Sequence, residues 1–206
     1  MTLDYEIIAS GSAGNCVRVE DMLFDVGVPY KKIRKHLYGI RYIFITHAHT
    51  DHLHKPTVIS IQKEFPRIVW IGSYDVAYKI PIKEVVGDKT RVAFRDREVQ
   101  VFECLHDVPT HGFVITKGDR SLIYATDTFS LENAPTQKYD YFFIESNHDE
   151  TKIEKIRNTA RKQYGYDAWK NAMRHLSTQK SKAFYYIHRR SKDSLWVELH
   201  KSERFY

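Results

Sequence analysis

The chain has 206 residues with a hydrophobic content of 42%, which is enough for one sizeable core and too little for two full domains. We therefore expect a single domain over residues 1–206, with a formal net charge of +6. No run approaches the roughly 18 apolar residues of a membrane span and there is no signal-peptide pattern, which predicts a cytoplasmic protein without a membrane partner. Cys16 and Cys104 lie in apolar surroundings without a pairing motif, so neither a disulfide framework nor a four-cysteine metal site is expected.

Short β-rich runs alternate with helical patterns along the chain. Branched and aromatic residues bounded by Gly, Asp and Lys turns predict strands over 4–10, 15–27, 41–46, 67–72, 99–106, 112–127 and 139–146. Helical spacing predicts helices over 29–37, 55–65 and 73–80, a long helix over 149–174 interrupted around Gly165, and a last helix over 179–189. This alternation predicts an α/β or α+β class with helices outside layered sheets.

The basic charge is concentrated in the last quarter of the chain. Residues 151–206 hold 14 Lys and Arg against 5 Asp and Glu, a net charge of +9, whereas residues 1–150 hold 18 against 21, a net charge of −3. This distribution favours a polyanionic partner, although solvated helix faces would give the same excess. The aromatic residues of this region either stack on bases or belong to the core, namely Tyr164, Tyr166, Trp169, Tyr185 and Tyr186.

One short loop after an apolar strand concentrates potential metal ligands. Its sequence HAHTDH offers His47, His49, Asp51 and His52 within six positions. Imidazole nitrogens and carboxylate oxygens are donors that first-row divalent ions accept at neutral pH. His47 and His49 face the same way in an extended loop and can chelate one ion, whereas Asp51 and His52 can turn toward a second. His54 lies beyond the cluster, and we expect it to be a solvated surface residue.

This loop resembles the His-x-His-x-Asp-His signature of the metallo-β-lactamase superfamily. Further elements follow the order of that family, namely SGSAGNC at 10–16, LFDVG at 23–27, CLHDVPTHGF at 104–113, IYATDTF at 123–129, FIESNHDE at 143–150 and MRHLST at 173–178. Together they are most similar to its YycJ/WalJ-type branch. The resemblance implies an α/β fold (α+β by some schemes), the αββα sandwich, in which two mixed sheets pack together with helices on both outer faces.

The resemblance also implies a role for each matching residue. One metal ion would be held by His47, His49 and His106, and a second by Asp51, His52 and His175, with Asp127 bridging the pair. Zn²⁺ is the first expectation for both ions and Mn²⁺ the second. Asp25 would orient the loop, unless it is an ordinary carboxylate at a strand end, and Gly27 would permit a tight turn.

The third ligand has two candidates because the segment HDVPTHGF contains both His106 and His111. His106 is preferred since it follows directly on a predicted strand. His111 stands between Pro109 and Gly112 and reads better as a turn or rim residue.

A centre with two divalent ions can polarise a phosphoryl or carbonyl oxygen and generate a bridging hydroxide, which predicts hydrolysis. Phosphodiester cleavage also needs a proton for the leaving oxygen. We expect His148 to be this general acid, oriented by Glu145, with Asp51 as the third catalytic residue. Alternatively, His148 caps the helix that begins near Asp149.

Two polar turns are candidates for contacts with a substrate phosphate. Ser12 and Asn15 lie in a glycine-rich turn, where backbone amides can approach an anion, although an ordinary hairpin would have the same composition. Ser177 and Thr178 precede a predicted helix whose N-terminus would favour a phosphate oxygen.

Three functions follow from these features. The first is a nuclease or phosphodiesterase acting on nucleic acid, with DNA favoured over RNA because the family branch implies exonuclease activity. The second is a small-molecule hydrolase, first of a cyclic nucleotide and then of a lactone or thioester, since only 54 residues separate His52 from His106 and leave little room for a polymer-gripping insertion. A homodimer could complete such a small pocket. The third is a silent binding module, against which the complete ligand set argues.

Overall fold

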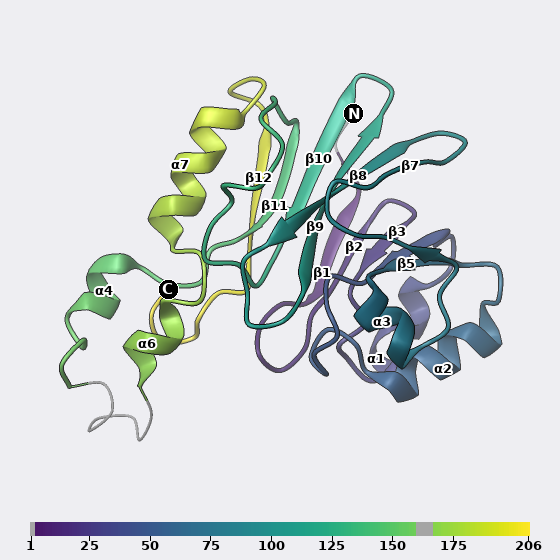
Figure 1. The fold of residues 1–206 in the computed structure, drawn as a ribbon, viewed down its shortest axis with the longest axis horizontal. Helices are drawn as coiled ribbons and strands as arrows, with labels where there is room; N and C mark the ends of the chain where they lie inside the picture. Colours follow the sequence, from purple (N-terminus) through teal and green to yellow (C-terminus); the bar gives the residue numbers. More distant parts are fainter. Residues whose placement is uncertain (1–2, 160–166) are drawn as a thin grey trace. The chain divides into compact units, whose positions relative to one another are not determined.

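The computed structural model describes residues 3–159 and 167–206. The chain divides into two compact units, residues 1–87 and residues 88–206, and each unit holds one of the two sheets. Figure 1 shows the elements of both units along the chain. The single domain expected from the sequence stays a prediction.

The first unit contains a six-stranded mixed sheet in simple sequence order. Its strands are β1 (Tyr5–Ala9), β2 (Cys16–Val19), β3 (Met22–Phe24), β4 (Tyr42–Phe44), β5 (Val69–Gly72) and β6 (Glu84–Val85). The pairs β1–β2 and β2–β3 are antiparallel, whereas β3, β4, β5 and β6 pair in parallel. The carboxyl ends of β3, β4 and β5 therefore meet at one edge, which is where parallel sheets commonly place ligand sites.

The helices of the first unit each contribute residues to the apolar core that covers this sheet, or lie beside those that do. They are α1 (Tyr30–Ile33), the short 3₁₀ helix η1 (Arg34–His36), α2 (Lys55–Glu64) and α3 (Tyr74–Lys79). Val58 and Ile61 of α2 and Val76 of α3 join Ile43 and Trp70 of the sheet in this core. Pro56 in the first turn of α2 fits a helix start, because its missing N–H would have no partner there.

The second unit contains the other mixed sheet, with the strand order β12-β11-β10-β9-β8-β7. Its strands are β7 (Arg91–Ala93), β8 (Glu98–Cys104), β9 (Thr110–Lys117), β10 (Arg120–Ala125), β11 (Tyr141–Glu145) and β12 (Leu195–Leu199). The first three pairings from β7 are antiparallel, whereas β10–β11 and β11–β12 are parallel. Strands β8, β10, β11 and β12 therefore run in the same direction and end at the same edge.

The helices of the second unit differ in part from the expectation. The predicted helix over 149–174 is wrong as one element, because α4 (Glu150–Glu154) and α6 (Ala168–Ala172) are separate and short, and Gly165 lies outside the described residues. The predicted last helix is confirmed as α7 (Thr178–His188), which lies beside β11 and β12 (Figure 1). Phe184 and Tyr185 of α7 pack with Phe142 in the core of this unit.

The sequence analysis did not predict three strands, namely β6, β7 and β12, because each is short or interrupted by charged residues.

Both cysteines are buried and free, as expected, and burial raises the pKa of both thiols. Among the described residues no helix combines the length and the hydropathy that crossing a bilayer would require.

Candidate metal and phosphodiester site

The HAHTDH loop begins at the carboxyl end of β4, where it is braced by the neighbouring strand end. Asp25 follows β3 and accepts hydrogen bonds from the Thr46 backbone N–H at 2.8 Å and from the Thr46 hydroxyl at 3.0 Å. Asp25 is fully buried and adopts φ 60°, a left-handed conformation that is uncommon outside glycine and least costly for Asp and Asn. Such local strain is often found where a site needs a fixed geometry.

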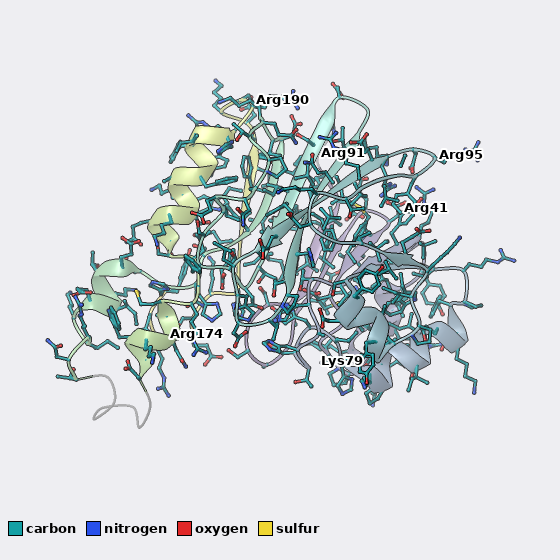
Figure 2. The ribbon with its side chains drawn as sticks, viewed as in Figure 1. Arg41, Lys79, Arg91, Arg95, Arg174 and Arg190 are labelled. Carbon is teal, nitrogen blue, oxygen red and sulfur yellow. The ribbon has the colours of Figure 1, made fainter. Side chains whose placement is uncertain are left out.

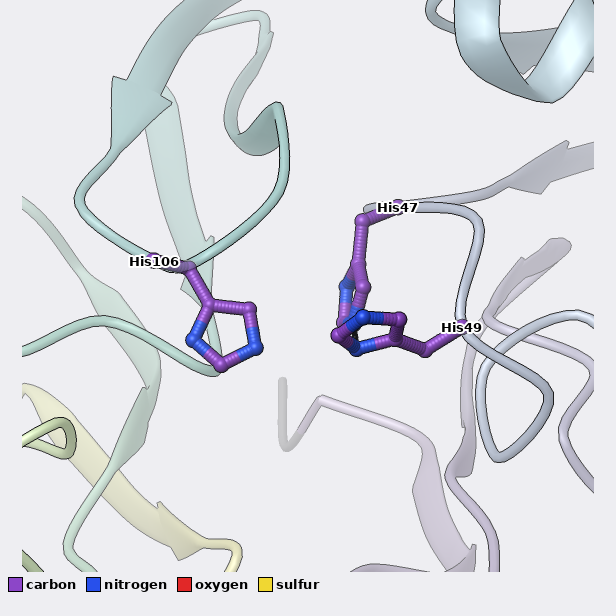
Figure 3. A group of neighbouring side chains, drawn as sticks. All are labelled: His47, His49 and His106. Carbon is purple, nitrogen blue, oxygen red and sulfur yellow. Dashed lines mark hydrogen bonds between the residues drawn. The ribbon is translucent and has the colours of Figure 1, made fainter. Parts of the chain in front are cut away.

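His47 and His49 turn their rings toward one another (Figure 3), with His47 buried and His49 half-buried. The distance from His47 Nε2 to His49 Nδ1 is 3.1 Å. Two nitrogens bound to one Zn²⁺ at about 2.1 Å with a tetrahedral angle would stand about 3.4 Å apart. This spacing is compatible with a shared ion, and the predicted role of the two histidines as ligands stays a prediction.

Asp25 also orients His52, the last histidine of the loop. His52 Nδ1 donates to Asp25 Oδ2 at 2.7 Å, and both side chains are fully buried. The Nε2 atom of the same ring lies 3.6 Å from Asp51 Oδ2. A carboxylate behind a histidine fixes its tautomer and directs the other nitrogen outward, as second-layer partners of metal ligands do. Burial raises the pKa of Asp25, and His52 opposes that rise.

We predict that Asp25→Asn weakens metal binding by about 10–100-fold, the usual cost of losing such a partner. Asparagine keeps the shape and tolerates φ 60°, but its amide cannot accept from both Thr46 N–H and His52 at once. Metal affinity measured by competition with a chromogenic chelator checks the effect. Asp21→Asn is the matched control and should keep the wild-type affinity, because Asp21 pairs with Arg41 from the turn between β2 and β3 and not with the loop.

Gly27 allows its own backbone to approach the backbone of Asp51 closely. A Cβ atom at this position would lie 1.6 Å from the Asp51 carbonyl oxygen and 2.8 Å from Asn15 N. The sequence predicted that glycine is needed here for a tight turn. That reason is wrong, because Gly27 is not among the residues with positive φ. Without a side chain, Gly27 lets the Asn15 N–H donate to Asp51 O at 2.7 Å.

The glycine-rich turn braces the loop from the other side. Asn15 is buried, its Oδ1 accepts from Gly11 N at 2.9 Å, and its Nδ2 lies 2.8 Å from His52 Nε2. The Asn15 amide is thus engaged inside the protein, and its predicted phosphate contact stays a prediction. Ser12 is exposed at the tip of the turn, and its predicted role stays a prediction.

His54 was expected to be a solvated surface residue. It is instead half-buried at the N-cap of α2, where its Nδ1 lies 2.8 Å from Thr57 Oγ1.

The second unit gathers four further donors at the carboxyl edge of its sheet. Asp127, Glu145, His175 and His200 each offer a ligand atom, and these atoms all lie within 4.8 Å of one another. Asp127 follows β10, Glu145 ends β11, and His200 follows β12. Because β10, β11 and β12 are parallel, their ends bring these residues together. His175 joins them from the connection between α6 and α7.

Glu145 is the centre of this group. Its Oε1 accepts from His175 Nδ1 at 2.7 Å and from His200 Nδ1 at 2.8 Å. Its Oε2 accepts from the backbone N–H groups of Thr128 and Leu176 at 2.9 and 3.3 Å. Glu145 is therefore a fully buried anchor whose two oxygens hold two imidazoles and two loops in place.

Asp127 and His200 form the closest pair around this anchor. His200 Nδ1 lies 3.0 Å from Asp127 Oδ1, whereas His175 Nδ1 lies 3.5 Å away. Asp127 and His200 both have positive φ, at 50° and 53°. His200 is a site residue that sequence reasoning missed, because strand β12 was not recognised. Its signal was the alternating run LWVEL that ends directly before the histidine.

The protonation of the cluster follows from its hydrogen bonds. Burial lowers the pKa of His200, but Asp127 and Glu145 outweigh it and hold that pKa well above its ordinary value. Burial also lowers the pKa of His175, but Glu145 outweighs this effect, so the pKa of His175 lies above its ordinary value. Burial raises the pKa of Glu145, and the two histidines bring it below its ordinary value.

The predicted pair of Glu145 and His148 is not joined in this structure, and its catalytic role stays a prediction. Within the described residues, no hydrogen bond joins the two side chains, and His148 Nδ1 is buried without a partner. Burial lowers the pKa of His148, so the ring is neutral at pH 7 and poorly suited to donating a proton. The alternative role as a helix cap is wrong, because Asp149 is the N-cap of α4 and accepts from Thr151 N and Lys152 N.

The two candidates for the third ligand lie in different settings. His106 follows β8 in a loop, drawn in Figure 3, and its ring centroid lies 6.0 Å from that of His175. His111 belongs to β9, where it pairs with Glu103 of β8, and it is buried. The backbone N–H of Leu105 donates to Thr128 Oγ1 at 2.9 Å, which ties the His106 loop to the Asp127 loop. These contacts favour His106, whose role as a ligand stays a prediction.

Ser177 and Thr178 stand at the start of α7, as predicted, but their hydroxyls are already used. Ser177 Oγ accepts from Lys180 N at 3.1 Å as the N-cap and donates to Glu150 at 2.6 Å. Thr178 Oγ1 accepts from Ser146 Oγ at 3.1 Å. The Glu150 carboxylate at this helix end disfavours a phosphate there, and the predicted contact stays a prediction.

This chain is similar to known proteins over most of its length. A family model described as "Beta-lactamase superfamily domain" matches residues 19–189. Exodeoxyribonuclease WalJ of Streptococcus pneumoniae is 30% identical over 200 residues, covering 84% of this chain and 70% of that protein. Exodeoxyribonuclease YycJ of Bacillus anthracis is 28% identical over 173 residues, covering 72% of this chain and 64% of that protein.

Solved structures show the same fold at low sequence identity. The short form of human tRNase Z has a TM-score of 0.70 at 18% identity. The match covers 97% of this chain and 93% of the tRNase Z chain. The metallo-β-lactamase fold protein YhfI of Bacillus subtilis has a TM-score of 0.69 at 14% identity, with 98% and 86% covered. The predicted α/β fold class and the predicted family are both confirmed, and the chain belongs to the beta-lactamase superfamily.

Proposed function

We propose that this protein is a two-metal phosphodiesterase that cleaves nucleic acid, with DNA as its first substrate. That it is a metal-dependent hydrolase follows from its family and its exodeoxyribonuclease relatives. The observation that carries the proposal is the group of Asp127, Glu145, His175 and His200 at the carboxyl edge of the second sheet. This group combines carboxylate and imidazole donors with a histidine that is partly open to solvent, as a hydrolytic site requires.

The proposed ligand set keeps six of the seven predicted residues and replaces one. His47, His49 and His106 would hold one ion, and Asp51, His52 and His200 the second, with Asp127 shared. His200 replaces His175 because it is more deeply buried and 0.5 Å nearer to Asp127, from 3.0 Å against 3.5 Å. When bound, Zn²⁺ or Mn²⁺ would polarise the phosphate and activate a water molecule.

His175 is then free to act on the leaving group. Its side chain is 20% exposed, so it can reach a substrate, whereas the His200 side chain is 6% exposed. Glu145 holds the His175 ring at 2.7 Å and stabilises its protonated form. A histidine backed by a buried carboxylate is a typical general acid. The proposed acid is therefore His175 with Glu145 as its orienting partner, in place of His148.

Basic side chains support a polyanionic substrate, although ion pairs use part of their charge. Figure 2 labels six of them, Arg41 and Lys79 in the first unit and Arg91, Arg95, Arg174 and Arg190 in the second. Arg91 pairs with Glu98 at 3.1 Å and Arg190 with Asp140 at 3.0 Å. Arg174 is adjacent to His175 in sequence, half-exposed, and 3.8 Å from Asp107, so it is the best placed for a phosphate.

The test is an activity screen over single-stranded DNA, duplex DNA, RNA and cyclic nucleotides with Zn²⁺ or Mn²⁺ supplied. We expect DNA cleavage by the wild-type chain and none by Asp51→Ala. A polymer bound through several cationic contacts should also lose affinity steeply with added salt, whereas cyclic-nucleotide turnover should change far less. Intact nucleic acid together with salt-insensitive hydrolysis of a cyclic nucleotide would replace the proposal with the small-molecule alternative.

A further inference from the structure

Helix α3 of the first unit presents two tyrosines to solvent. Tyr74 is 80% exposed and Tyr78 is 94% exposed. Four residues apart in a helix, they lie on the same face, whereas Val76 between them is fully buried in the core. Single exposed hydrophobic residues are common, but two open tyrosine rings on one helix face form a contiguous aromatic surface that can bind a partner.

The same helix is tied to the metal loop. Lys79, the last residue of α3, donates from Nζ to the carbonyl oxygen of Ala48 at 2.5 Å. Ala48 stands between His47 and His49, so this hydrogen bond fixes α3 against the backbone of two proposed ligands. Figure 2 labels Lys79 at this helix. Tyr78 is the chain neighbour of Lys79, and consecutive Cα atoms are only about 3.8 Å apart.

We infer that Tyr74 and Tyr78 form a stacking platform for unpaired bases of the strand being cleaved, an inference that rests on the proposed nuclease function. Every base has a flat aromatic face, so a pair of tyrosines near the metal loop can bind a strand of any sequence. Lys79 and Lys83 balance Asp75 and Glu84 over residues 74–84, so this segment carries no net negative charge that would repel a phosphate backbone. This polar setting argues against a second protein, whose docking would need a continuous apolar patch.

The platform specifies the form of the substrate. Bases of a duplex already stack on their neighbours, so only a single strand or a frayed end can place bases on Tyr74 and Tyr78. Other aromatic candidates are less suited. Tyr185 is buried against Trp196, Tyr186 lies beneath the Arg189 guanidinium at 4.6 Å, and Tyr164 and Tyr166 lie outside the described residues. The protein should therefore bind single-stranded DNA more tightly than a blunt duplex.

The experiment compares Tyr74→Ala/Tyr78→Ala with Tyr74→Trp/Tyr78→Trp, each in an Asp51→Ala background that prevents cleavage. Fluorescence anisotropy with a short labelled single strand measures binding. The double alanine variant should weaken binding at least about 25-fold and the double tryptophan variant should not, because stacking is worth ~1–3 kcal/mol per base. Tyr38→Ala is the control, since Tyr38 is 66% exposed but packs against Phe65 at the far end of α2 and should bind like the parent.

The outcomes separate this inference from the proposed function. Wild-type cleavage of DNA, with unaltered single-strand binding by the double alanine variant, would overturn the platform and leave the nuclease proposal standing. Absence of cleavage of any nucleic acid by the metal-loaded wild-type chain would reject both. In the same tyrosine variants made with Asp51 intact, the platform predicts a rise in KM for single strands that exceeds any effect on a small aryl phosphodiester and that tryptophan reverses.

Discussion

Replacing His175 with alanine should slow hydrolysis of a DNA phosphodiester by about 10²–10⁴-fold, the usual contribution of a general acid. The physical reason is that the departing sugar oxygen is a poor leaving group unless it receives a proton. His175 is held by Glu145 at 2.7 Å and is partly exposed, so it can supply that proton. An aryl phosphodiester that releases p-nitrophenolate needs no proton, and its hydrolysis should slow far less.

Metal content distinguishes an acid from a ligand. We expect His175→Ala to keep both ions after reconstitution, whereas His200→Ala should lose one of them and act poorly on both substrates. His148→Ala is the matched control for removal of a buried imidazole, because its ring hydrogen-bonds neither Glu145 nor any other described residue through Nδ1. It should retain the wild-type ratio of DNA to aryl phosphodiester activity.

The opposite pattern would reverse the roles. If His175→Ala lost a metal ion and slowed both substrates equally, His175 would be the ligand that the sequence motif implied. If His148→Ala alone showed the selective loss of DNA hydrolysis, His148 would be the general acid, as the sequence predicted, although its ring is buried and neutral. Each result can be read from metal analysis and two substrates measured in parallel.

The sequence predicted four ligands in the HAHTDH loop because all four residues lie within six positions, and their role as ligands stays a prediction. It also predicted Asp127 and Glu145 from short motifs at strand ends. It could not assign partners within the second unit, because hydrogen bonds there join residues 30 and 55 positions apart, Glu145 to His175 and to His200. Which imidazole reaches a carboxylate depends on the order of strands in the sheet.

His200 illustrates the same limit at the level of secondary structure. The predicted elements ended with the helix at residue 189, so the histidine after LWVEL had no strand to place it beside Asp127. The positive φ values at Asp25, Asp127 and His200 could not be predicted either, because the residue type alone does not determine them. Three sharp turns at strand ends nevertheless direct these side chains into hydrogen-bonded clusters, and this conformation is part of how both clusters are built.

Replacing Gly27 with alanine should damage activity through the metal loop without any change in a ligand. The added Cβ would stand 1.6 Å from Asp51 O, so the loop backbone must move. Overpacking of this kind costs about 1–3 kcal/mol in the free energy of unfolding. A displacement of about 1 Å in a catalytic group costs about 10²-fold in rate, so we expect a loss of that size on both DNA and the aryl phosphodiester.

Gly39→Ala separates this effect from lost stability. Gly39 adopts φ 84° with nothing within 4 Å of an added Cβ, so alanine there is strained by roughly 1–2 kcal/mol but touches no part of the metal loop. Both variants should unfold at lower denaturant concentration than the wild type, and only Gly27→Ala should lose activity and metal affinity. Because Gly27 meets Asp51 through its backbone, equal activity in the two variants would mean that the loop adjusts freely, and the close approach of Gly27 to Asp51 would then have no part in placing the ligands.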